Sequence, residues 1–176
     1  LAAYPELSTN GRLPKGWRKK TGKIYPYKGG TSGFSALGFE PYSELDAYQV
    51  AQAMGVNAVR YTLTKDLKKT LCSKCELFTS KEYSYLPIGQ LVPKGGMKAI
   101  REYYMELGQP FVDALEDMLV FDAVICNTDR HLGNFGVLVD NKTNKIAAPA
   151  PLFDHGNSLF SLGGTDLWDN QKAFDE

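Results

Sequence analysis

Cysteine is scarce in this sequence: the 176 residues include three, at positions 72, 75 and 126. Three thiols are too few, and odd in number, for the disulfide framework of small secreted domains, so we expect a reducing compartment. No apolar run approaches the roughly 18 residues that a membrane span needs, and the N-terminus lacks a secretory signal pattern. An excess of one charge is also missing, because 20 basic residues balance 20 acidic ones. This balance argues against a surface that attracts nucleic acid or anionic membrane as a whole.

The rest of the composition is that of a globular protein. Hydrophobic residues make up 43% and charged residues 23% of the chain, both near the average for folded domains. A length of 176 residues corresponds to one domain or to one small two-lobed unit. The chain begins at Leu1 rather than Met and stops at Glu176 within a polar stretch. We therefore expect it to be part of a longer protein.

The first third of the chain predicts a hairpin, a loop and a helix. Aromatic and apolar residues over 13–27 flank the turn signal Thr-Gly at 21–22, which favours a β-hairpin. Glycine and serine dominate residues 29–39, which we expect to form a loop. A helix then opens with Ser43 as its N-cap and stops at Gly55.

The remainder predicts strands first and helices later. The segment 79–96 is rich in proline and glycine and is expected to form turns. The other predicted elements are two strands, two helices and a closing hairpin, over residues 56–63, 70–78, 99–107, 110–124, 135–139 and 146–150. This order indicates an α+β protein with an N-terminal antiparallel sheet lobe, residues 1–78, and a mainly helical C-terminal lobe, residues 79–176.

Two polar segments in the second half carry the chemistry. Residues 126–134 read Cys-Asn-Thr-Asp-Arg-His-Leu-Gly-Asn, directly after the second predicted helix, and residues 151–156 read Pro-Leu-Phe-Asp-His-Gly. The predicted hairpin between them brings Asp129, Asn134 and Asp154 to one end of the same small sheet. Two carboxylates and a carboxamide there suit a hard cation such as Mg²⁺.

This set of residues is the one that phosphoryl transfer needs. One acid orients the attacking hydroxyl, while an Asn and a second acid hold the metal that neutralises the phosphate oxygens. The five-position spacing from Asp129 to Asn134 is that of the protein-kinase catalytic loop, and Asp154 followed by Gly156 stands where the kinase Asp-Phe-Gly would, with His155 in the middle. We predict Asp129 as catalytic base, and Asn134 and Asp154 as Mg²⁺ ligands.

A kinase also needs an upstream lysine for the ATP phosphates and a helix glutamate that fixes this lysine. Lys28, at the end of the predicted hairpin, and Glu44, at the start of the helix, occur in the required order. Glu40 is the alternative to Glu44, but it is expected in the loop. The segment from Glu76 to Phe78 falls where the interlobe hinge would bind adenine.

These motifs resemble the HipA family of bacterial serine/threonine kinases, which belong to toxin–antitoxin systems. The resemblance rests on Asn-Thr-Asp-Arg-His-Leu-Gly-Asn at 127–134 and Ala-Pro-Ala-Pro-Leu-Phe-Asp at 148–154, and it extends over roughly residues 8–160. The family's phosphate loop is approximated by residues 8–15. Because the N-terminal subdomain and most C-terminal helices of the family are missing, a shortened kinase fits better than the full toxin.

The resemblance implies a protein-kinase-like two-lobed fold, ATP and Mg²⁺ as cofactors, and transfer of the γ-phosphate to a Ser or Thr hydroxyl of a protein, including the enzyme itself. The resemblance also implies that Lys28 binds ATP. It also implies a bacterial cytoplasmic protein, or an effector delivered from there. An antitoxin or DNA-binding protein is the expected partner, while direct nucleic-acid binding and a membrane span are not expected.

Three alternatives stay open. The catalytic loop also resembles that of phosphoinositide kinases, but residues 157–176 hold four acids and one lysine, which disfavours an anionic lipid. A degenerate kinase fold that only binds is the second alternative, although all the expected polar positions are filled. The third is a zinc or redox site at Cys72 and Cys75. Their spacing of three places the two thiols on opposite faces of a regular strand.

Overall fold

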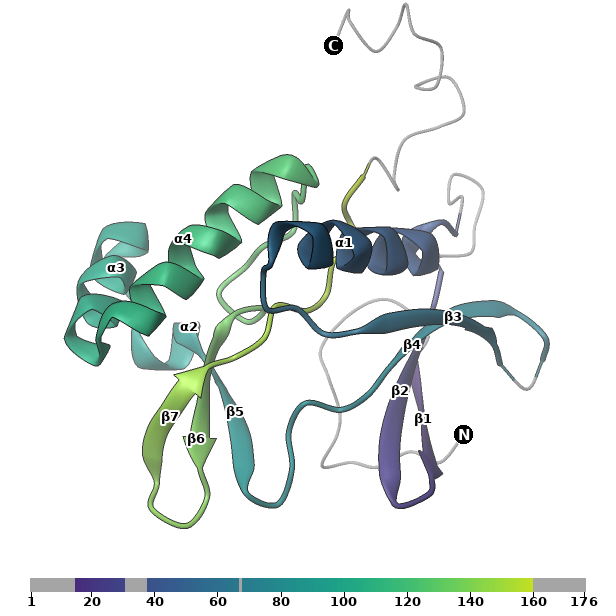
Figure 1. Ribbon diagram of the computed structural model, residues 1–176, viewed down its shortest axis with the longest axis horizontal. Helices are drawn as coiled ribbons and strands as arrows, with labels where there is room; N and C mark the ends of the chain where they lie inside the picture. Colours follow the sequence, from purple (N-terminus) through teal and green to yellow (C-terminus); the bar gives the residue numbers. More distant parts are fainter. Residues whose placement is uncertain (1–14, 31–37, 67, 160–176) are drawn as a thin grey trace, which may run out of the picture.

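The computed structural model describes residues 15–30, 38–66 and 68–159. Its elements are arranged in two antiparallel sheets with helices packed on them (Figure 1). In chain order they are β1 (Lys15–Lys20), β2 (Lys23–Gly29), α1 (Glu40–Met54), β3 (Tyr61–Lys65), β4 (Leu71–Cys75), β5 (Tyr83–Pro87), α2 (Ile88–Leu91), α3 (Gly96–Leu107), α4 (Gln109–Val124), β6 (Gly136–Asp140) and β7 (Lys145–Pro149). No helix within these described ranges has the length and apolar character that crossing a membrane requires.

The first sheet has the strand order β1-β2-β4-β3 and is antiparallel throughout. The hairpin predicted over 13–27 is confirmed in its described part as β1 and β2. Its turn residues Thr21 and Gly22 have φ angles of 48° and 82°. Two successive positive φ values give the turn the twist of the flanking strands, which is why Thr-Gly can close a two-residue hairpin.

Helix α1 begins earlier than the sequence suggested. Its first residue is Glu40 and its N-cap is Phe39, so the prediction of Ser43 as N-cap is wrong. A proline in the first turn lacks the N–H that a helix start leaves unpaired, and Pro41 therefore fits inside the helix rather than before it. Glu44 consequently lies in the second turn, and it is buried together with Glu40.

The second sheet has the strand order β5-β6-β7; α2 and α4 pack against it, and α3 packs against α4. The predicted helices and closing hairpin are confirmed, with small shifts of their ends. The segment 79–96 is not only turns, because it contains strand β5 and the short helix α2. Pro87 is the last residue of β5. Because β5 is an edge strand that pairs only with β6, the N–H that proline lacks interrupts no hydrogen-bond ladder.

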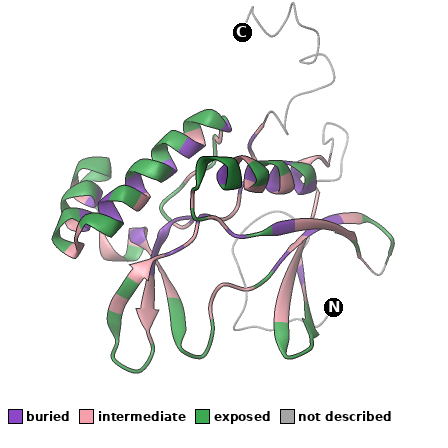
Figure 2. Cartoon of the chain, viewed as in Figure 1, coloured by how far each residue is buried: buried purple, intermediate pink, exposed green. Residues whose placement is uncertain are grey.

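The main hydrophobic core joins α1 to the second sheet and its helices, while a smaller cluster of Val59, Tyr61 and Cys75 lies at the first sheet. The main core combines Ala47 and Ala51 of α1 with residues of α3, α4 and β6, among them Tyr104, Phe121 and Val137. Figure 2 shows the buried faces of α1 and α4 turned toward the strands, with exposed residues on the outer faces. The boundary predicted after residue 78 falls between the two sheets, but α1 packs against both parts.

The segment before β3 is held by Leu152, which follows β7, rather than by a sheet. The strand predicted over 56–63 is regular only from Tyr61 onward. Ala58 instead forms a parallel bridge with Leu152. Leu152 N–H donates to the Asn57 carbonyl at 2.9 Å, and Val59 N–H donates to the Leu152 carbonyl at 2.8 Å. These bonds place the residues just before Asp154 beside the first sheet.

Candidate active site

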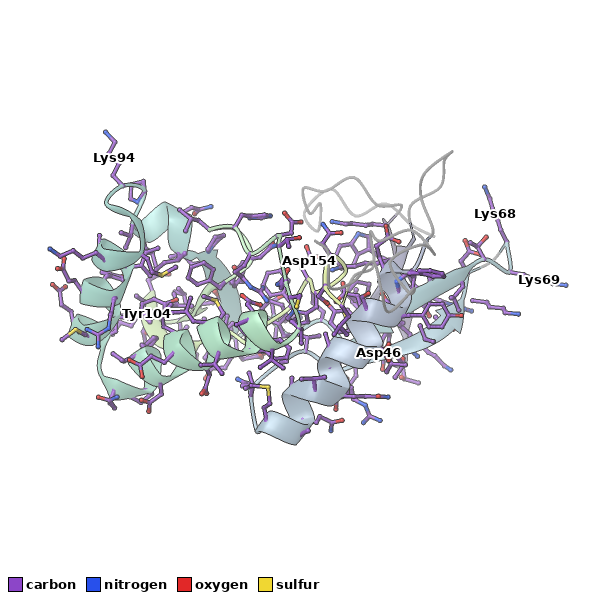
Figure 3. All side chains as sticks on the ribbon, turned by 90° about the horizontal axis from the view of Figure 1, so that it is seen from above. Asp46, Lys68, Lys69, Lys94, Tyr104 and Asp154 are labelled. Carbon is purple, nitrogen blue, oxygen red and sulfur yellow. The ribbon has the colours of Figure 1, made fainter. Side chains whose placement is uncertain are left out.

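Lys28, near the end of β2, forms ion pairs with carboxylates from two distant parts of the chain. Its Nζ lies 2.7 Å from Glu44 Oε1 on α1 and 2.6 Å from Asp154 Oδ1 beyond β7. The lysine and glutamate side chains are 13% and 1% exposed, and the aspartate side chain is 29% exposed. In Figure 3 Asp154 lies near the middle of the molecule, whereas Lys68 and Lys94 extend outward at opposite ends. The predicted pair of Lys28 and Glu44 is thus present, and Asp154 joins it.

The pKa values of Lys28 and Asp154 are both shifted by their surroundings. Burial lowers the pKa of Lys28, but Glu44, Tyr61 and Asp154 outweigh it, and the pKa lies well above its usual value. Burial raises the pKa of Asp154, but Lys28 outweighs this effect and the pKa ends below its usual value. The site therefore holds an ammonium and a carboxylate at neutral pH, the charge states needed to bind phosphate and a cation.

The turn that carries Asp154 is fastened to α1. Asp154 has a φ of 63°, a left-handed conformation that Asp adopts more readily than most residues. The next residue, His155, donates its N–H to Glu44 Oε2 at 2.9 Å, so the two oxygens of Glu44 hold the lysine and this turn respectively. A Cβ on Gly156 would lie 3.3 Å from Glu40 Cβ, which shows how closely the turn approaches the helix.

The polar loop after α4 is anchored by Asp122 in the last turn of that helix. Asp122 accepts hydrogen bonds from Arg130 Nε at 2.8 Å and Arg130 Nη2 at 2.9 Å, a bidentate pair. Its Oδ1 also accepts from Asn127 Nδ2 at 2.9 Å. The loop that carries Asp129 is therefore fixed on both sides of this residue.

The guanidinium of Arg130 connects this loop to the Asp154 turn. Its Nη1 donates to the carbonyls of Asn134, at 3.1 Å, and Phe153, at 2.8 Å. The side chain is 8% exposed. One nitrogen thus holds the backbone of Asn134 and of the residue before Asp154, which brings the two predicted metal ligands to the same place.

His155 occupies the position where kinases have Phe, and it is fully buried. Its ring lies 5.2 Å from that of Phe121 and 6.4 Å from that of Tyr61. Its Nδ1 is 3.1 Å from Arg130 Nη2. Because arginine is always protonated, Nδ1 must accept and the imidazole proton sits on Nε2. Burial, followed by the charges of Arg130 and Lys28, lowers the pKa of His155 to about 3. A neutral histidine here packs like an aromatic residue and accepts one hydrogen bond.

Asp129 and Asn134 lie on the same loop, as predicted. Asn134 is 5% exposed, and its Nδ2 lies 3.4 Å from the Asp129 carbonyl oxygen. Its Oδ1 is therefore the atom that can coordinate a cation. Asn134 and Asp154 fit Mg²⁺ because this ion is usually held by one or two protein oxygens together with substrate phosphates. Among the described residues there is no cluster of three or more His, Cys, Asp and Glu side chains suited to a metal.

The predicted hinge contributes to packing around Asp154. The ring of Phe78 lies 5.3 Å from that of Phe153. Leu77 donates its N–H to a carbonyl of β2 at 3.2 Å. Glu76 forms an exposed ion pair with Lys23 at 2.6 Å. These contacts hold the segment against β2 and the Asp154 turn, while adenine binding by Glu76 and Phe78 stays a prediction.

Some residues of the site were not given a role from the sequence. Asp122 does not stand at a kinase motif position, so no spacing identified it. Arg130 lies within the motif, but only its contacts reveal its role. Lys15 pairs with Lys28 across β1 and β2, so both side chains share one face of the sheet. Burial lowers the pKa of Lys15, with Asp154 opposing the shift. The rest of the phosphate-loop candidate, 8–14, lies outside the described residues.

The two cysteines of the zinc alternative are free and buried on β4. Cys72 Sγ donates to the carbonyl of Thr64 at 3.6 Å. Cys75 packs with Tyr61, and burial raises the pKa of its thiol to about 12. Such a thiol is protonated at neutral pH and does not act as a metal ligand without a strong lowering of its pKa. The geometry gives no support to a zinc site at this pair.

Comparison with known proteins agrees with the geometry at the level of the fold. No protein family matches the sequence, and no curated protein does. Among solved structures, the crystal structure of a Helicobacter pylori proinflammatory kinase, CtkA, matches with a TM-score of 0.75 and 20% sequence identity. The chain has a kinase-like fold. The match covers 92% of this chain and 62% of that kinase, so the chain spans less than two thirds of its length. The predicted α+β, kinase-like architecture is thereby confirmed.

Proposed function

We propose that this chain is the catalytic part of an ATP-dependent phosphotransferase that phosphorylates Ser or Thr hydroxyls of proteins. The observation that carries the proposal is the position of Lys28, bonded to Glu44 at 2.7 Å and to Asp154 at 2.6 Å. A lysine fixed by a helix glutamate beside a metal-ligand Asp is the arrangement that positions ATP phosphates in kinases.

The proposed reaction assigns one role to each residue. The acceptor oxygen attacks the γ-phosphorus, the bond from that phosphorus to the bridging oxygen breaks, and ADP leaves with the electron pair. The hydroxyl proton passes to the Asp129 carboxylate. Lys28 orients the α- and β-phosphates. Asn134 and Asp154 would hold Mg²⁺, which supplies positive charge to the phosphate oxygens.

A protein substrate is favoured over a lipid because residues 157–176 carry four acids and one lysine, which would repel an anionic membrane. Membership of the HipA family, a role in a toxin–antitoxin system and an antitoxin or DNA-binding partner are proposals that rest on the motifs at 127–134 and 148–154.

The test is a titration of the 176-residue chain with ATP, with and without Mg²⁺, followed by transfer of labelled γ-phosphate to three acceptors: the chain itself, a mixed Ser/Thr peptide pool and phosphoinositide vesicles. We expect Mg²⁺-dependent binding and labelled Ser or Thr. Absence of any ATP response would reject the proposal. Binding without transfer would support a kinase-shaped binding module, and transfer to phosphoinositide vesicles alone would support a lipid kinase.

A further inference from the structure

Asn157 belongs to the turn that follows Asp154, yet it contacts the loop that carries Asp129. Its Nδ2 donates a hydrogen bond of 2.9 Å to Asp129 Oδ2. Its carbonyl accepts a hydrogen bond of 3.4 Å from Thr128 N–H. Two residues later, Leu159 N–H donates to the Ile125 carbonyl at 2.8 Å. Three bonds therefore tie this turn along the start of the polar loop.

The bond from Asn157 is the one that fixes the Asp129 side chain. The backbone of Asp129 is already engaged, since its N–H donates to Asn127 Oδ1 at 3.1 Å and its carbonyl accepts from His131 N–H at 2.9 Å. Within the described ranges, no other side chain donates to the Asp129 carboxylate. A terminal carboxyl torsion is broad and roughly two-fold unless a partner restrains it.

We propose that Asn157 is a positioning residue that orients the catalytic base. Its amide holds Asp129 Oδ2, so that Oδ1 is presented to the acceptor hydroxyl and receives its proton. This inference rests on the proposed kinase function. An amide suits the task because it donates a hydrogen bond at every pH and cannot take up the proton itself.

The position of Asn157 also couples the base to the metal-ligand turn. Asp154 and Asn157 are three residues apart, and the turn between them is fastened to α1 through the N–H of His155 and to the base through the amide of Asn157. Asp129 is therefore aligned when the turn adopts the conformation in which Lys28 contacts Asp154. Displacement of the turn would break the contact of Asp154 with Lys28 and, at the same time, the hydrogen bond that orients Asp129.

The experiment compares Asn157→Ala, Asn157→Asp and a matched control in the full chain. Asn141→Ala removes an Asn side chain whose Nδ2 donates to the Lys81 carbonyl at 3.0 Å, in the turn between β6 and β7. Mg²⁺·ATP affinity, kcat and KM for a mixed Ser/Thr peptide pool, and the pH profile of kcat are measured for each. We expect Asn157→Ala to keep ATP affinity and to lower kcat at least about ten-fold, because loss of alignment slows the chemical step.

Asn157→Asp supplies the readout that a purely structural role would not move. It preserves the shape and the bond to Thr128, but it places a second carboxylate at the 2.9 Å contact. Two carboxylates this close share a proton, so kcat is expected to be lowest where this proton occupies the base and to rise with pH as the proton leaves. The rise should stop near the kcat of Asn157→Ala, because an ionised carboxylate cannot donate the hydrogen bond that orients Asp129. The Asn141 control should match the wild type.

The inference is overturned if Asn157→Ala keeps the wild-type kcat, or if the pH profile of Asn157→Asp follows that of the wild type. Either result leaves the proposed function intact, because the wild-type chain still transfers phosphate. A wild-type chain without transfer overturns the proposed function and this inference together, so the two failures are distinguishable.

Discussion

Lys28 and Asp154 are 126 positions apart in the sequence, and the lysine Nζ lies 2.6 Å from the aspartate Oδ1. The contact connects the first sheet to the segment that follows the second sheet. Because Glu44 shares the same ammonium group, a substitution at any of these three positions changes the environment of the other two.

Lys28→Ala is expected to abolish phosphate transfer and to lower the free energy of unfolding. The variant leaves Glu44 and Asp154 without their cation, and breaking a buried ion pair costs about 3–5 kcal/mol. Lys28→Arg should not restore transfer, because a planar guanidinium does not reproduce a compact ammonium. Transfer rates and urea unfolding of each variant test this.

Lys23→Ala is the matched control, since its ion pair with Glu76 is more than half exposed on both sides. An exposed pair of this kind contributes little to stability, because water and salt screen the two charges. Full transfer activity in Lys28→Ala would show that another lysine has the phosphate role, with Lys15 across the hairpin as the candidate.

Asp129→Asn and Asp154→Asn are expected to differ in what they remove. Asp129→Asn keeps the shape but cannot accept the hydroxyl proton, and general base catalysis is worth about 10²–10⁴-fold in rate. Its Mg²⁺·ATP affinity should stay near that of the wild type. Asp154→Asn removes a negative charge from the proposed metal site, so affinity and turnover should fall together. Calorimetry and phosphotransfer assays on both variants separate the two cases.

Asp117→Asn serves as the control for these two changes, because Asp117 lies exposed on α4. Wild-type turnover in Asp129→Asn, combined with undiminished Mg²⁺·ATP affinity in Asp154→Asn, would contradict the assigned roles. The chain would then be a kinase-shaped binding module.

Arg130→Lys keeps the charge but loses most of the hydrogen bonds of the guanidinium, so it is expected to destabilise the fold by about 2 kcal/mol and to reduce activity. The guanidinium serves Asp122, two carbonyls and His155 at once, and an ammonium with one nitrogen cannot reach these acceptors together. Denaturant unfolding measures the loss. Arg101→Lys on α3 should change stability by less than about 1 kcal/mol, because its contact with Glu116 is 3.6 Å long and exposed. Equal stability of Arg130→Lys and the wild type would show that the hydrogen bonds of the guanidinium are not needed for folding.

Many sequence predictions agree with the structure where local chemistry decides. Thr21-Gly22 closed the hairpin because both residues adopt positive φ, and Gly55 ended α1 with a φ of 73°. The start of α1 was misplaced because Ser43 is a good N-cap in isolation, whereas its side chain is buried within the helix. Strand β5 was hidden by the proline that ends it.

The site was predictable as far as its motif residues. The order of lysine, glutamate, aspartate, asparagine and aspartate led to Lys28, Glu44 and the loop residues. Its supporting contacts were not predictable, because Asp122 and Asn157 act through side-chain bonds that only the folded backbone brings about. A single sequence contains the residues but not the distances between them.

Stability is expected to fall as pH drops below about 6.5 because of His155. The unfolded imidazole binds a proton below its usual pKa near 6.5, whereas the folded one stays neutral down to a pKa of about 3. The unfolded state therefore binds more protons between these values, and the free energy of unfolding decreases by up to about 1.4 kcal/mol per pH unit as pH falls.

His155→Asn should flatten this slope between pH 4.5 and 6.5, since Asn can still accept from Arg130 but does not titrate. Thermal or urea unfolding across this range gives the comparison. A wild-type slope retained in His155→Asn would mean that another group is responsible.

The bridge between Ala58 and Leu152 joins residues that are 152 − 58 = 94 positions apart. On a ribosome, β1 to β4 can pair as soon as residue 75 has emerged. Residues 57–59, however, cannot form their backbone hydrogen bonds until Leu152 has been made. Asp154 reaches Lys28 only after that step, so the nascent chain carries an exposed sheet and an incomplete site while residues 76–152 are being made. A stop codon anywhere before position 152 would leave that early sheet without the backbone contacts of Leu152. We expect such a product to be bound by chaperones or degraded by proteases, and not to act as a smaller enzyme.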